Sequence, residues 1–113
     1  MITVRKKQIE KMDEKYYQNF IQMAVEYIQE NYPEYYFQNE LSKWQIWVKT
    51  KISESEYYKI EKNSEIMEYI DLHLNYDILN KEPKDRWVID LLTYPDRMAE
   101  KKIDMLIEQL NFR

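Results

Sequence analysis

The chain has 113 residues and none of them is glycine. Glycine adopts positive φ more readily than any other residue, and the tight turns of β-hairpins depend on that conformation. Phosphate-binding loops and dinucleotide fingerprints likewise need glycine at fixed spacings. The composition therefore disfavours a hairpin-rich β fold and excludes the glycine-rich nucleotide sites.

Without glycine, the helix ends need another residue that tolerates the left-handed conformation, and asparagine is the next best. We expect asparagine to fill this role, because five asparagines stand near expected helix boundaries: Asn31, Asn63, Asn75, Asn80 and Asn111.

Apolar residues recur at three- and four-residue steps, which is typical of amphipathic helices. The sequence predicts an all-α fold, a compact bundle of about five helices with a long first helix, in a single domain over residues 1–113. The expected helices cover residues 1–32, 41–60, 64–79, 84–94 and 96–112. Their expected inward faces are Ile9, Met12, Tyr16, Phe20, Met23, Ala24, Tyr27 and Ile28; Leu41, Trp44, Val48 and Ile52; Ile66, Met67, Ile70, Leu74 and Ile78; Trp87, Val88, Leu91 and Leu92; and Ala99, Ile103, Leu106, Ile107 and Leu110.

Capping residues and prolines set the expected boundaries. Thr3 is a candidate cap for the first helix, and Asn63 or Ser64 for the third. Pro33 ends the first helix, because a residue before proline is pushed out of the α region. Pro83 and Pro95 fit the first turns of the last two helices.

The formal charge of −4 is unevenly distributed. Residues 16–82 carry −6, residues 1–15 carry +2, and residues 83–113 are neutral. An acidic middle disfavours nucleic-acid binding, which needs a basic footprint. It is either an ordinary solvated surface or a surface for a basic partner.

The chain has no cysteine, which excludes disulfides, thiolate metal sites and cysteine nucleophiles. No apolar run approaches the roughly 20 residues that cross a membrane, and the N-terminus lacks the apolar segment of a signal peptide. We expect a cytoplasmic protein without a cofactor, a metal or a membrane partner.

His73 is the only histidine, and Asp77 follows it by one helical turn. Such a pair can orient an imidazole as a general base, or it can be a plain surface interaction. A single histidine with scattered carboxylates lacks the convergence of a catalytic site, so a structural or interface role is favoured. Asp71 is either solvated or a buried polar anchor that ties helices together, with Trp87 as the apolar anchor of this region.

The chain has eleven tyrosines, several of them in adjacent pairs. Exposed tyrosines beside acidic groups suit a protein interface, whereas boundary tyrosines of a helical bundle need no partner. The candidate partner-binding residues are Tyr35, Tyr36, Glu40, Glu54, Tyr57 and Tyr58.

Four segments resemble a family of small helical proteins encoded beside type VI secretion and Rhs polymorphic-toxin genes: MITVRKKQIEKM, FIQMAVEYIQENYPE, MEYIDLHLNYDILNKEP and WVIDLL. The chain departs from the family around Asn75–Tyr76, where the family often has glycine. The matching positions are Ile2, Arg5, Gln8, Phe20, Pro33, Tyr69, Ile70, Asp71, Leu72, Asp77, Pro83, Trp87 and Leu91.

The resemblance implies a non-catalytic protein that binds a cognate toxin or secretion component, as an immunity protein or an adaptor. The alternatives are a phage or mobile-element inhibitor that binds a host protein, and a structural subunit that self-associates as a homodimer. An enzyme is disfavoured.

Overall fold

A computed structural model describes residues 14–95 and 97–112. Within these ranges the chain forms six α-helices, one 3₁₀ helix and no strand. The predicted all-α class is therefore confirmed. Thr3, Ile9 and Met12, which were expected to begin the first helix and its apolar face, lie outside the described residues.

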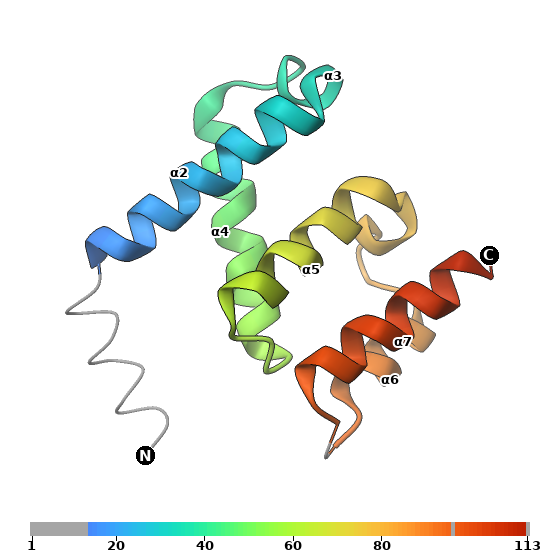
Figure 1. Cartoon of the computed structure of the whole chain (residues 1–113). Coiled ribbons are helices and arrows are strands. Elements are labelled where there is room, and N and C mark those ends of the chain that lie inside the picture. Colours follow the sequence, from blue (N-terminus) through green and yellow to red (C-terminus); the bar gives the residue numbers. More distant parts are fainter. Residues whose placement is uncertain (1–13, 96, 113) are drawn as a thin grey trace. The chain divides into compact units, whose positions relative to one another are not determined.

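The chain divides into two compact units, residues 1–49 and 50–113, and the boundary falls inside helix α4. In the first unit, α2 (Glu14–Asn31) packs against the short α3 (Pro33–Tyr36), and α4 (Leu41–Tyr57) follows (Figure 1). The indole N–H of Trp44 donates to the Tyr36 carbonyl at 3.0 Å, and the two rings stack. This contact ties the beginning of α4 to α3.

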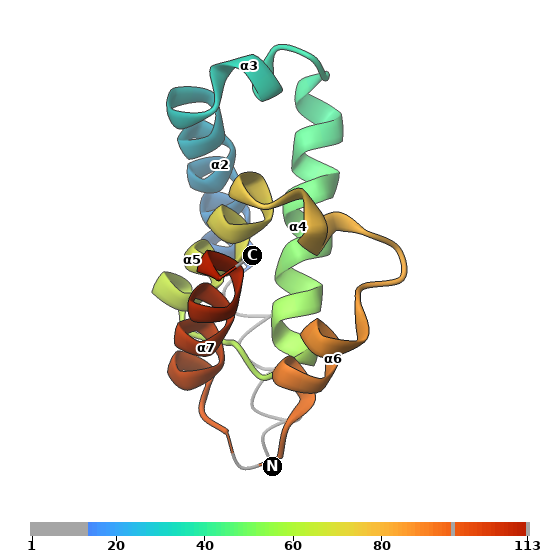
Figure 2. The ribbon, with the colours of Figure 1, turned by 90° about the vertical axis from the view of Figure 1, so that its right-hand side faces the viewer.

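The second unit holds the end of α4 together with α5 (Asn63–Asn75), the 3₁₀ helix η1 (Asp77–Asn80), α6 (Arg86–Thr93) and α7 (Ala99–Asn111). Helix α7 lies beside both α5 and α6 (Figures 1 and 2). The core of the second unit is built from buried side chains of every helix in the unit and of the loop after α4: Ile52, Ile60, Ile66, Tyr69, Ile70, Leu74, Leu79, Val88, Leu92, Ile103 and Leu106.

The prediction for Pro33 is confirmed, because α2 ends at Asn31. Proline then begins α3, so the segment between the first two expected helices, 1–32 and 41–60, contains a short helix. The predictions for Pro83 and Pro95 are wrong, since α6 begins at Arg86 and α7 at Ala99. Pro83 follows a cis peptide bond in an extended loop.

Side chains hold these loops in non-helical form. Lys84 donates to the Leu79 carbonyl at 2.7 Å, and Lys81 pairs with Asp85 at 2.7 Å. Before α7, Arg97 donates to the Leu91 carbonyl at 3.4 Å. In these loops, side-chain contacts between residues four to six positions apart accompany a non-helical backbone, and the prolines do not begin the following helices.

The third expected helix stops at Asn75, four residues early. Tyr76 is extended, with φ −129° and ψ 103°. The Asn80 side chain donates to the His73 carbonyl at 2.7 Å, and that carbonyl is the one that Asp77 N–H would need to continue the helix. The competing side-chain bond explains the break.

Asparagine marks the helix ends, but not in the predicted conformation. Asn31, Asn75 and Asn80 are each the last residue of a helix, and each donates its side-chain amide to a backbone carbonyl. Among the described residues, the positive φ belongs to Lys59 alone, at 67°. Lys59 N–H bonds the Glu56 carbonyl, and the next N–H bonds the Ser55 carbonyl at 2.7 Å. These two bonds form a Schellman motif in which lysine takes the place of glycine.

The predicted inward faces are buried along most of their length, and three expected members are exposed: Tyr16, Met23 and Leu41. On α2, Tyr17, Ile21 and Val25 were expected to widen the inward face; Ile21 and Val25 are buried as expected, whereas Tyr17 is exposed. Four polar or charged residues that were not expected on the inward faces are also buried: Lys51, Ser55, His73 and Lys102.

Candidate functional site

The predicted partner-binding residues are divided between the two units. In the first unit, Tyr35 and Glu40 are exposed, and Tyr36 is half-buried against Trp44. In the second unit, Tyr57 and Tyr58 lie at the end of α4 and Glu54 lies one turn earlier. The expected exposure of Glu54 does not hold, because its side chain is only 21 % exposed and takes part in a buried network.

The polar cluster consists of Lys51, Glu54, Tyr69, His73 and Lys84. Glu54 is its centre: the carboxylate accepts from Tyr69 Oη at 2.9 Å and from Lys51 Nζ at 3.1 Å. Lys84 Nζ lies 3.4 Å from the same carboxylate. One half-buried carboxylate therefore serves two buried ammonium groups and a buried phenol.

The tautomer of His73 follows from its neighbours. Nδ1 lies 2.8 Å from the Tyr69 carbonyl, which can only accept, so Nδ1 carries the proton. Nε2 lies 3.1 Å from Lys84 Nζ, which can only donate, so Nε2 accepts. Both ring nitrogens are thus engaged within the protein.

Burial sets the protonation states in the cluster. Burial, together with the charges of Lys51 and Lys84, lowers the pKa of His73 to about 3. For Glu54, burial acts to raise the pKa, but the two lysines and the bonds from Lys51 and Tyr69 outweigh it and lower the pKa. Burial first, and then the Glu54 charge, raises the pKa of the Tyr69 phenol. The cluster is therefore a neutral imidazole and a phenol around a compensated carboxylate.

This arrangement holds helices together. A proton acceptor has to present a lone pair to a substrate, and the Nε2 lone pair of His73 already faces Lys84. The predicted pairing of His73 with Asp77 does not rest on a shared helix, because α5 ends between them. Among the described residues, no group of three His, Asp or Glu side chains could hold a metal ion.

The two predicted anchors, Asp71 and Trp87, are not members of the polar cluster. Asp71 is partly exposed, and its carboxylate accepts from Asn75 at 3.3 Å within α5. Trp87 is partly exposed on α6, where Val88, Leu91 and Leu92 are buried. Within the second unit, a part-buried hydrogen bond from Tyr69 to Glu54 links α5 to α4.

The aromatic–basic surface consists of Tyr57, Tyr58, Lys59, Tyr94 and Arg97. These residues line a depression of about 570 Å³ between the end of α4 and the segment that joins α6 to α7. Tyr57 is 75 % exposed and meets Tyr58 edge to face at 5.1 Å. The Arg97 guanidinium carbon lies 4.3 Å from the centre of the Tyr94 ring. The surface thus combines three tyrosine rings with two cations.

Lys102 forms the floor of this depression and is only 4 % exposed. Its ammonium donates to the Tyr58 carbonyl at 2.7 Å, a bond that joins α7 to the end of α4. Burial, with the charges of Arg97 and Lys59, lowers the pKa of Lys102. Within the described ranges, none of these three cations forms a salt bridge.

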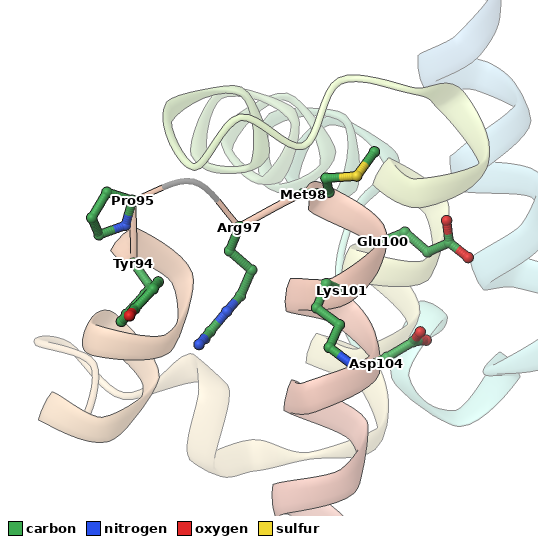
Figure 3. Close-up of a pocket in the computed structure, with 7 residues that line it drawn as sticks. All are labelled: Tyr94, Pro95, Arg97, Met98, Glu100, Lys101 and Asp104. Atoms are coloured by element: carbon green, nitrogen blue, oxygen red, sulfur yellow. The ribbon is translucent and has the colours of Figure 1, made fainter.

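A second depression, of about 670 Å³, adjoins the first along Tyr94, Pro95 and Arg97. Figure 3 shows the side chain of Arg97 between Tyr94 and helix α7, with Met98 at the start of that helix. Met98 is 75 % exposed. The aromatic–basic surface is therefore extended by a large apolar side chain.

The predicted partner-binding residues include Tyr57 and Tyr58 of this surface but not Lys59, Tyr94, Arg97 or the buried Lys102. One signal was readable: Lys102 stands four residues before Leu106, on the edge of the apolar face of its helix. A lysine at such a position either extends to solvent or is held inside.

Comparison of the chain with protein-family models, with curated proteins and with solved structures finds no match. The resemblance to proteins encoded beside secretion and toxin genes stays a prediction. Within the described residues, no helix is long and apolar enough to cross a membrane.

Proposed function

We propose that this chain is a non-catalytic protein-binding protein that covers a partner protein. In its most specific form, the proposal is that the partner is a toxin or a component of a bacterial secretion system, and that the chain acts in the cytoplasm as an immunity protein or an adaptor. The specific form rests on the sequence resemblance. The general form rests on the aromatic–basic surface.

The observation that supports protein binding is the gathering of exposed aromatic side chains and an arginine around one depression. Tyrosine and arginine are enriched among residues that dominate binding energy, because they offer large contact areas and directed hydrogen bonds. Tyr57 and Met98, both 75 % exposed, give this surface apolar area that water covers in the free protein. Binding a partner would remove that area from water.

The polar cluster supports the non-catalytic part of the proposal. Its carboxylate, imidazole and ammonium groups bond one another, so they have little capacity left for a substrate. Their role in this proposal is to keep α4 and α5 together, which holds Tyr57 and Tyr58 in place at the end of α4.

The test is co-expression of the chain with the product of the adjacent gene, followed by co-purification and a growth assay. We expect a 1:1 complex, and rescue of growth if that product is a toxin. Tyr57→Ala and Tyr94→Ala should each weaken the complex about tenfold or more, the effect of losing one strongly contributing contact.

Phe112→Ala is the matched control, because Phe112 is also a highly exposed aromatic residue, at 81 %, but lies at the other end of α7. It should leave the affinity unchanged. If no complex forms and growth is not rescued, the proposal of an immunity protein or adaptor is contradicted. A partner that tolerates both tyrosine variants but is lost with Phe112→Ala would place the interface elsewhere.

A further inference from the structure

We propose that the aromatic–basic surface binds an acidic peptide segment of a partner protein, with a carboxylate of the segment between Arg97 and Lys59 and an apolar side chain against the tyrosine rings. This inference rests on the proposed protein-binding function and adds the chemistry of the partner.

The charge of the depression is the first argument. Its described lining carries three cations, Lys59, Arg97 and Lys102, and one carboxylate, that of Glu56. The chain as a whole has a net charge of −4, whereas the described lining of this depression has more positive than negative charges. At physiological ionic strength, charges farther away than about 8 Å are largely screened, so a ligand in the depression responds mainly to the charges nearest to it.

The burial of Lys102 is the second argument. A buried ammonium is stabilised by a nearby anion, yet the neighbouring charges that act on Lys102 are those of Arg97 and Lys59. Its hydrogen bond to the Tyr58 carbonyl supplies one partner and no compensating charge. An incoming carboxylate would supply that charge and would reduce the repulsion among the three cations.

The geometry of Arg97 favours a carboxylate beside an apolar group. The guanidinium packs on the Tyr94 ring and donates one N–H to the Leu91 carbonyl. Arginine has five N–H donors in a planar fork that matches a carboxylate, so donors remain for a ligand. The rings of Tyr57 and Tyr94 flank the cations and provide the apolar wall.

The backbone of Lys59 is the third argument. A non-glycine residue in the left-handed region is uncommon and costs about 1–2 kcal/mol relative to a right-handed residue. Glycine would fit the same Schellman motif without that penalty. Lysine at this position places a cation at the rim of the depression.

The test uses the full chain and two short peptides, each acetylated and amidated. One alternates glutamate with phenylalanine, and the other has glutamine in place of glutamate. Titration is followed by the amide NMR signals at low salt. We expect the glutamate peptide to shift the signals of residues 56–59, 92–94, 97 and 102. The glutamine peptide should bind at least about tenfold more weakly.

Two variants test the cations. Arg97→Gln and Lys59→Gln should each weaken the acidic peptide about tenfold, because each removes a charge-assisted contact. If Arg97→Gln unfolds the loop by removing the packing of Arg97 on Tyr94, the Lys59→Gln variant still tests the role of the cations. Lys43→Gln, an exposed lysine of the first unit, makes the same charge change and should have no effect.

Equal binding of the two peptides would overturn the proposal, and so would an unchanged affinity in both Arg97→Gln and Lys59→Gln. Inorganic phosphate is the third arm: if it shifts the same signals at the same concentration as the acidic peptide, the surface is a small-anion site and the peptide proposal fails. The co-expression test separates the two proposals. If Tyr57→Ala abolishes the complex but both cation variants still form it, the proposal of protein binding is supported and the proposal of an acidic segment is contradicted.

Discussion

The polar cluster and the aromatic–basic surface are built from the same kinds of residue, and helix α4 contributes to both. In the polar cluster, two lysines share the Glu54 carboxylate, and His73 and Tyr69 complete the hydrogen bonds. At the aromatic–basic surface, Lys59 and Arg97 line a depression together with the buried Lys102, and none of these three cations is ion-paired within the described residues.

The difference lies in where the compensating charge comes from. Buried charges destabilise a fold unless opposite charges and hydrogen bonds compensate them. In the polar cluster, one carboxylate of the protein itself lies against both ammonium groups, and hydrogen bonds engage the imidazole and the phenol, so the cluster serves stability. The described lining of the depression at the aromatic–basic surface has three cations and one carboxylate, and the proposed acidic segment would supply further negative charge.

The largest test of this comparison is Glu54→Gln. The substitution leaves Lys51 and Lys84 buried without their shared counter-charge, and we expect it to lower the free energy of unfolding by about 3 kcal/mol. Urea unfolding followed by circular dichroism measures the change. Glu61→Gln, at an exposed position shortly after the end of α4, should change it by less than about 0.5 kcal/mol. Similar effects of the two substitutions would mean that the polar cluster does not stabilise the fold.

A pH titration of stability tests the neutral state of His73. The folded-state pKa of about 3 lies below the ordinary value of 6.5, so protons favour the unfolded chain. Stability should be complete above pH 6.5 and should fall as the pH decreases toward 3. By pH 5 the loss should be about 2 kcal/mol.

Because His73 is the only histidine, His73→Gln should remove most of this slope between pH 7 and pH 5. The slope matters here rather than the absolute stability, which the substitution itself lowers. A wild-type protein with constant stability over that interval would show that His73 takes up its proton as readily in the folded chain as in the unfolded chain, contrary to the hydrogen-bond pattern.

The smallest effect concerns Lys59. Lys59→Gly relieves the left-handed conformation and should raise the free energy of unfolding by up to about 1 kcal/mol. The same substitution removes a cation from the depression, so it should weaken the acidic peptide. Thermal unfolding and the peptide titration measure the two effects on one variant. A more stable variant with unchanged binding would separate the conformation of Lys59 from the function proposed for its charge.

Much of the fold was predictable because it depends on local rules. The absence of glycine, the three- and four-residue apolar steps and Pro33 correctly indicated an all-α chain whose first described helix ends at Asn31. The asparagines were correctly placed at helix ends. Their mechanism was not, because a side-chain amide that bonds a carbonyl can replace a left-handed residue.

The sites were less predictable, because they join residues far apart in the chain. Glu54 looked like a surface acid beside Tyr57, but it bonds Tyr69 across 15 positions. Lys102 reaches the Tyr58 carbonyl across 44 positions. No local pattern reveals which carboxylate meets which lysine.

The sequence by itself determined the helical class, the end of α2 before Pro33, the position of asparagines at helix ends, and most of the buried apolar faces, since these depend on residues within one or two turns. Only the tertiary structure decided that His73 is neutral, that Glu54 is drawn into a network, and that Lys59, Arg97 and Lys102 gather without a paired carboxylate among the described residues. Burial and long-range proximity set the charge states of such groups, and both exist only after the helices have packed.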